Sequence, residues 1–169
     1  MKFTMLAILT AAAPLALAAG ASPDTSFYKT LAAGGMSEVD LGRLAEQKST
    51  DPKVKDFAQM MVKDHSAANQ KLESLAAAKD VPLPKTLDAG GEAMKSKLQG
   101  LSGSSFDKAY IESQLQAHEK TVNLLEKEIS SGQDPQAKAF AQSVLPTVQH
   151  HLEAVRTLAH EAGVKVAQQ

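Results

Sequence analysis

The stretch from Asp51 to Asp80 constrains the fold more strongly than any other part of the chain. It opens with Asp51-Pro52, an N-cap residue followed by proline at the first helical position, and then contains neither Pro nor Gly. Its core-facing residues recur at alternating intervals of four and three, the spacing of one face of a bundled helix. They are Val54, Ala58, Met61, His65, Ala68, Leu72 and Leu75. Only His65 among them is not apolar.

Three other segments repeat this spacing, so we expect helices over residues 24–49, 52–79, 105–131 and 135–162. The core-facing residues of the first are Phe27, Leu31, Gly34, Glu38, Leu41 and Ala45. Those of the third are Ile111, Leu115, His118, Val122, Leu125 and Ile129. Those of the last are Ala137, Ala141, Val144, Val148, His151, Val155 and Leu158. The pair Gly34-Gly35 indicates a close helix approach or a kink, and Pro146 predicts a kink.

The connection between the second and third long helices differs from the two short turns. Pro82 and Pro84 break the second helix, and residues 87–101 are predicted to form a short helix or an irregular crossover. We therefore expect an all-α fold over residues 22–169: an up-down-up-down four-helix bundle with a crossover segment between its second and third long helices.

The N-terminus is typical of a secretory signal peptide. Met1-Lys2 supplies a positive charge, residues 3–17 form an apolar run, and small residues follow at Ala16-Leu17-Ala18 and Ala19-Gly20-Ala21. The alternative, an uncleaved anchor, is disfavoured because the run is shorter than the ~20 residues of a membrane span. We expect residues 1–21 to be removed, with no transmembrane span afterwards, and the mature protein to be soluble in the periplasm or cell envelope.

Charge and cysteine content exclude several function classes. The formal net charge of −1 gives no support to a nucleic-acid partner. The absence of Cys excludes disulfides and thiolate metal sites. No nucleophile–base pair, phosphate loop or acid pair is recognisable, so an enzyme is the less favoured reading, and only a metal-activated water can carry chemistry.

A layer of polar residues stands in the core-facing pattern. Counted from the two Asp-Pro turns, Glu38, His65, His118 and His151 fall at similar depths, if both turns lie at the same end of the bundle. One carboxylate and three imidazoles suit a single Zn, Fe, Cu or Ni ion and disfavour Mg and Ca. Metal binding by these residues is expected to weaken as the pH falls through ~6.5, the ordinary pKa of imidazole. The alternatives are a buried hydrogen-bonded Glu/His network and a wrong helix phase.

Other polar residues are assigned to supporting or surface positions. Asp64, Asn69 and Gln114 are candidates to orient the ligands, and His150 lies beside them or on the surface. His160 lies off the core-facing pattern and is expected to be exposed.

The segments Ser37–Ala45 and Phe57–Asn69 resemble a bacterial family of exported proteins of unknown function. The match continues through Leu101-Ser102-Gly103, Phe106-Asp107, His118 and His150-His151-Leu152. Members are often labelled "putative outer membrane protein", and the resemblance implies export and a ferritin-like four-helix fold. It implies no activity.

The wider ferritin-like group carries Glu-x-x-His pairs for a di-iron centre, and this chain has none. The residues three positions before its histidines are Val62, Leu115, Thr147, Val148 and Thr157. The sequence therefore favours a mononuclear site. We interpret the protein as an exported metal-binding bundle with a role in envelope metal handling or stress. The alternative is a structural or interaction module whose polar layer only fixes the bundle register.

Overall fold

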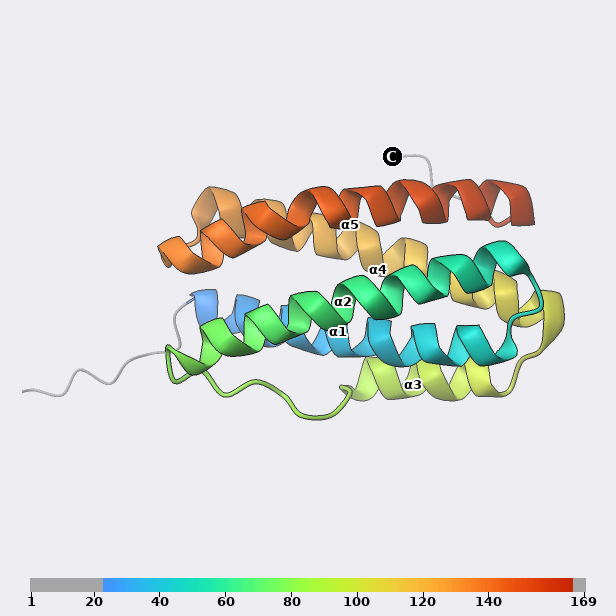
Figure 1. The fold of residues 1–169 in the computed structure, drawn as a ribbon, viewed down its shortest axis with the longest axis horizontal. Coiled ribbons are helices and arrows are strands. Elements are labelled where there is room, and N and C mark those ends of the chain that lie inside the picture. Colours follow the sequence, from blue (N-terminus) through green and yellow to red (C-terminus); the bar gives the residue numbers. More distant parts are fainter. Residues whose placement is uncertain (1–22, 166–169) are drawn as a thin grey trace, which may run out of the picture.

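The computed structural model describes residues 23–165, and within this range the fold is built only from helices, as expected. Four long helices, α1 (Pro23–Lys48), α2 (Pro52–Ala77), α4 (Gly103–Ser131) and α5 (Pro135–Ala162), lie side by side, and the short α3 (Ala89–Gln99) packs along one side (Figure 1). The predicted signal peptide lies outside the described residues.

The two Asp-Pro sequences cap helices as their order predicts. The Asp51 side chain accepts a hydrogen bond from the backbone N–H of Lys53 at the start of α2. Asp134 accepts one in the same way from the N–H of Gln136 at the start of α5. Each bond satisfies one of the donors that a helix start leaves free, so the local sequence determines where these helices begin.

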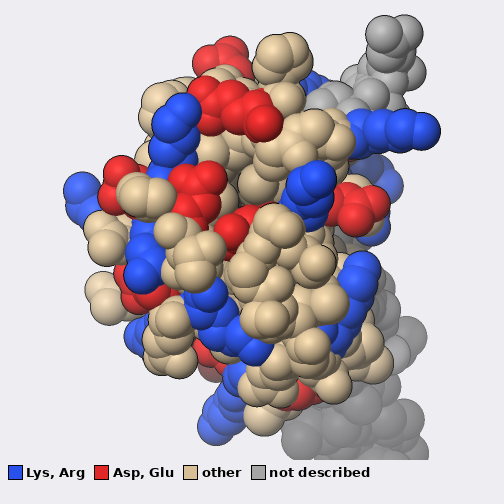
Figure 2. Space-filling model, turned by 90° about the vertical axis from the view of Figure 1, so that its right-hand side faces the viewer, with Lys and Arg blue, Asp and Glu red and all other residues tan. Residues whose placement is uncertain are grey.

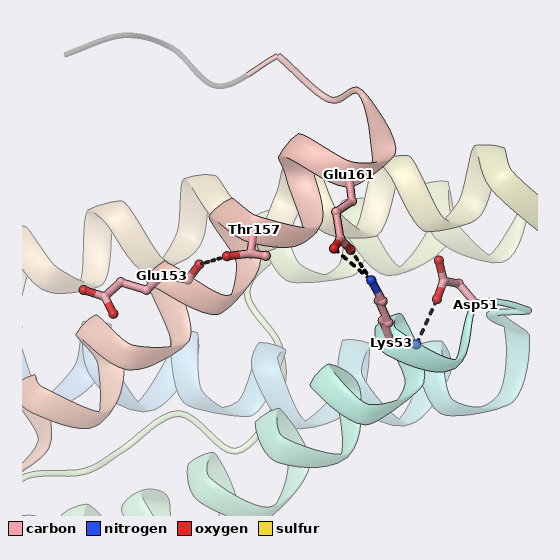
Figure 3. A network of polar contacts seen from close by, with 5 residues as sticks. All are labelled: Asp51, Lys53, Glu153, Thr157 and Glu161. Carbon is pink, nitrogen blue, oxygen red and sulfur yellow. Dashed lines mark hydrogen bonds and ion pairs between the residues drawn. The ribbon is translucent and has the colours of Figure 1, made fainter.

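The order of helix directions differs from the up-down-up-down prediction, which is wrong. Lys53 Nζ lies 2.8 Å from Glu161 Oε1, so α2 begins beside the end of α5 (Figure 3). At the opposite end, Tyr28 Oη and Lys79 Nζ both contact Asp134 Oδ2, at 3.1 and 2.8 Å. The start of α1, the end of α2 and the α4–α5 turn therefore share one end, and α2 and α4 run in the same direction.

The crossover is the physical reason for this reversal. After α2, residues 80–88 and then α3 run back along the helices, so that α4 starts near the α1–α2 turn (Figure 1). Lys48 Nζ, at the end of α1, accordingly contacts the Gln99 carbonyl oxygen and lies 5.8 Å from the ring centre of Phe106. A tight turn reverses the chain direction, whereas a connection that spans the molecule restores it.

The core consists of two hydrophobic clusters, one toward each end of the long helices. The cluster nearer the α1–α2 turn includes Leu41, Ala45, Val54, Phe57, Met61, Phe106, Tyr110, Leu115, Leu152 and Val155. The cluster nearer the α4–α5 turn includes Phe27, Tyr28, Leu72, Ala76, Leu125, Ala137, Phe140, Ala141 and Val148. On each long helix, the polar residue predicted to face the core lies between the residues that the helix supplies to one cluster and those that it supplies to the other. The polar layer therefore divides the core.

Both interruptions of the helical pattern, Gly34-Gly35 and Pro146, lie inside helices. Gly34, which was predicted to face the core, is exposed, whereas Gly35 is buried, and a Cβ on Gly35 would fall 2.0 Å from Asn69 Oδ1. The glycine thus permits the close approach of α1 and α2. Helix α5 continues through Pro146 to Ala162.

None of the helices within residues 23–165 combines the length and apolarity that crossing a bilayer requires. At the end of the molecule that carries the α1–α2 turn, basic and acidic side chains are interspersed (Figure 2).

Candidate metal centre

Three histidines from three helices meet in the polar layer. The ring centres of His65 (α2), His118 (α4) and His151 (α5) lie 5.4 to 5.6 Å apart. One nitrogen from each ring can be chosen so that all three lie within 4.8 Å of one another. This is the only group of three or more His, Asp or Glu residues within 23–165 with such spacing.

The layer forms in spite of the reversed hairpin because each histidine lies near the middle of its helix. His65 is central in Pro52–Ala77, His118 in Gly103–Ser131, and His151 lies just past the centre of Pro135–Ala162. A residue at the middle of a helix stays at the same height when the helix direction is inverted. The comparison of depths assumed that both turns lie at one end, but it still placed the three histidines at one level.

Two of the rings are oriented by hydrogen bonds to the protein. His118 Nδ1 lies 2.9 Å from the backbone carbonyl oxygen of Gln114, so this nitrogen carries a proton and donates it. His151 Nε2 lies 3.1 Å from Asp64 Oδ2 and donates to that carboxylate. Each bond leaves the other ring nitrogen as the one with a lone pair, which is the usual arrangement around a bound metal.

The remaining nitrogens are buried and lack partners. His65 Nε2, His118 Nε2 and His151 Nδ1 have no hydrogen-bond partner among the described residues. Because a buried polar atom without a partner is costly, three in one place indicate that something outside the chain satisfies them.

The surroundings of His65 and His151 keep these two rings neutral. Burial, together with the neighbouring His118 and His151, lowers the pKa of His65 to about 3. Burial also lowers the pKa of His151, although Asp64 opposes that shift. An imidazole must be neutral to bind a metal, so His65 and His151 are in the binding form at neutral pH. The residues present therefore fit a nitrogen-bound transition metal.

Glu38 lies next to this group and is not part of it. Its side chain is buried, and burial raises the pKa of its carboxyl, while His118 and Gln114 act in the opposite direction. Its Oε2 atom and both amide atoms of Gln114 lack partners within residues 23–165. The structure thus places Glu38 beside the three histidines and close to the side-chain amide of Gln114.

The supporting residues were only partly identifiable from the sequence. Asp64 orients a histidine as expected, whereas Gln114 does so through its backbone carbonyl, which any residue type supplies. Asn69 instead faces Gly35. Sequence analysis missed Tyr110, which is fully buried with its hydroxyl unpartnered among the described residues. Tyr110 lies one helical turn before Gln114, and this spacing is the feature of the sequence that could have identified it.

The two remaining histidines are surface residues. His150 is exposed, although its ring centre lies 6.4 Å from that of His151, and His160 is exposed as predicted. Neither belongs to the three-histidine group.

Comparison with known proteins places this chain in a family. The family described as "Domain of unknown function (DUF4142)" matches residues 9–158, and the chain belongs to it. No curated protein matches the sequence.

Solved structures of other proteins share the fold at low sequence identity. A "putative secreted protein DUF305" from Streptomyces coelicolor is 16% identical with a TM-score of 0.73, over 89% of this chain and 99% of that one. CopM in its Cu(I)-bound form is 15% identical with a TM-score of 0.68, over 82% of this chain and 96% of that one. CopM is also known in an Ag-bound form, with a TM-score of 0.67, 15% identity and coverage of 82% and 96%. The outer-membrane label receives no support from these structures.

Proposed function

We propose that this protein is an exported metal-binding protein that holds one transition metal ion through His65, His118 and His151. The convergence of three histidines, each with a buried ring nitrogen that lacks a partner, is the observation that carries the proposal. Neutral imidazoles are ligands for Zn, Cu, Fe and Ni. Glu38, which the sequence suggested as a fourth ligand, is assigned a supporting role: its carboxylate offsets the charge of the ion from nearby.

Copper is the ion to test first. The chain lacks the thiolates that strong Cu(I) and Zn sites often use, so the imidazoles must carry the affinity. The fold similarity to CopM, known in Cu(I)-, Cu(II)- and Ag-bound forms, supports this choice. The role we assign is binding and handling of the metal in the cell envelope rather than catalysis.

One specific observation favours the alternative of a purely structural layer. The bonds from His118 to the Gln114 carbonyl and from His151 to Asp64 hold two of the rings through groups of the protein itself. In that case the polar layer serves only to fix the register in which the helices pack, a role known for buried polar groups in bundles.

Metal titration of protein made without a His tag separates these functions. We expect calorimetry with Cu, Zn, Ni and Fe(II) to show one site, and the bound ion to raise the melting temperature because it binds only the folded state. His65→Ala and His118→Ala should abolish both effects, while the exposed His160→Ala should retain them. Binding no tighter than about millimolar, or equal loss in all three variants, contradicts the proposal.

A further inference from the structure

A cavity of about 890 Å³ lies between the α1–α2 hairpin and the α4–α5 hairpin, and the histidine layer forms part of its wall. Small-molecule sites in proteins have volumes of roughly 300–1,000 Å³. A bound ion alone needs far less space, so the cavity has room for a second occupant.

Most of the cavity wall is apolar and comes from all four long helices. The larger apolar residues that line it are Leu31, Leu72, Leu124, Phe140, Val144 and Val148. Placing apolar surface against this wall removes both surfaces from water and is favourable. The lysines that line the cavity, Lys71, Lys120 and Lys127, are exposed, so the more buried part of the wall favours an uncharged, apolar body.

One polar part of the wall lies next to the histidines and contains atoms without hydrogen-bond partners. Glu38, Gln114, His65 and His151 line the cavity. Glu38 Oε2 and the amide oxygen and nitrogen of Gln114 are buried without partners in the described range. Together they offer two acceptors and one donor group to a molecule that enters, so they suit a head that carries an N–H or O–H.

The histidine group itself leaves room for an outside ligand. An ion held by three protein side chains keeps a coordination position for water or another small ligand. Because His65 and His151 line the cavity, an outside ligand approaches the ion from this side.

We propose that the cavity binds an uncharged, mainly apolar small molecule whose head supplies a lone pair to the metal ion and an N–H or O–H to Glu38 and Gln114. The inference rests on the proposed metal site and names the class of ligand that this site takes.

The probe is 4-phenylimidazole, whose ring nitrogen binds metals, whose N–H is the donor and whose phenyl group is the apolar body. Calorimetry and visible absorption of the Cu(II)-loaded full-length protein measure its binding. Imidazole has the head without the body, and toluene has the body without the head. We expect 4-phenylimidazole to bind about tenfold more tightly than imidazole and to change the Cu(II) absorption. Equal affinity of the two overturns the proposal.

Two variants test the two halves of the cavity. Val144→Trp fills the apolar part and should weaken 4-phenylimidazole binding about tenfold while leaving imidazole unchanged. Gln149→Trp, on the exposed face of the same helix, should change neither. Gln114→Leu removes the amide and should weaken both heteroaromatic probes by about tenfold.

Metal titration of each protein separates the possible failures. If no metal binds to the wild type, the proposed function and this inference both fail. If the metal binds and 4-phenylimidazole shows no preference over imidazole, or if Val144→Trp weakens both probes equally, only the cavity inference fails. Imidazole binding to Val144→Trp also reports that the variant is folded.

Discussion

His151 Nε2 donates a hydrogen bond to Asp64 Oδ2 over 3.1 Å, so a carboxylate on α2 orients an imidazole on α5. This contact joins the two hairpins at the level of the three histidines. It also determines which nitrogen of His151 has the free lone pair, and it gives a direct test of the supporting residues.

Asp64→Asn is expected to weaken metal binding by about tenfold without abolishing it, because the neutral amide holds the His151 proton less strongly. Competition titration against a chelator of known affinity measures the change. Asp56→Asn, at an exposed position of the same helix, is the matched control and should keep the wild-type affinity. An unchanged affinity in Asp64→Asn would contradict the role of Asp64 in orienting His151 for metal binding.

The pKa of His65, lowered to about 3 by burial, predicts acid sensitivity of the metal-free protein. Between this value and the ordinary imidazole pKa of ~6.5, the unfolded chain binds a proton that the folded chain does not. The free energy of unfolding should therefore decrease as the pH falls from 7 to 5, by about 1–2 kcal/mol from this residue. Urea denaturation of wild type and His65→Leu, with chelator present, measures the difference. The variant should lose less stability over the same range, and equal slopes would contradict the assignment.

Glu128 gives the opposite pH dependence at the other end of the molecule. Burial, followed by its contact with Asp24, raises the pKa of Glu128 to about 7. The folded state holds its proton more strongly than the unfolded state, so this contribution to stability is present below ~4.5 and is lost as the pH rises through 7.

Glu128→Gln should accordingly stabilise the protein by about 1 kcal/mol at pH 8 and have little effect at pH 4.5. Chemical denaturation at the two values measures this. Glu126→Gln, an exposed change on the same helix, should show no such pH dependence. A stabilisation equal at both values would mean that the Glu128 charge is not responsible.

Gly34 and Gly42 on α1 predict opposite effects of the same substitution. A Cβ on Gly34 would have no contact within 4 Å, so Gly34→Ala should stabilise the helix by about 1 kcal/mol. A Cβ on Gly42 would lie 2.9 Å from Val62 Cγ2 and 3.1 Å from the Ala58 carbonyl oxygen. Gly42→Ala should destabilise by about 1–3 kcal/mol because α1 and α2 must separate. Thermal melts of the two variants make the comparison, and a shift in the same direction for both would contradict the close packing.

The helices and the composition of the polar layer could be predicted because both follow from short-range patterns. Asp51 and Asp134 cap helices through bonds to residues two positions away. The intervals of three and four residues place His118 and His151 on buried faces whatever the neighbouring helices do. For this reason the predicted helix bounds lie within two residues of those observed.

The direction of the second hairpin could not be predicted in this way. It depends on the path of residues 80–102, where prolines end one helix and glycines weaken the next without indicating where the chain goes. That path is decided by the packing of α3, whose Leu98 is fully buried in the core. The cavity also has no local signal, because its wall combines residues from distant parts of the chain.

The sequence by itself determined that this protein is helical, where its long helices begin, and that three histidines and a glutamate face its core. Caps and side-chain periodicity act over a few residues, so they can be read along the chain. Only the tertiary structure decided that α2 and α4 run in the same direction, that Glu38 stands outside the three-histidine group, and that a cavity opens beside it. Those features depend on how the two hairpins pack, and packing is determined by contacts between residues far apart in the sequence.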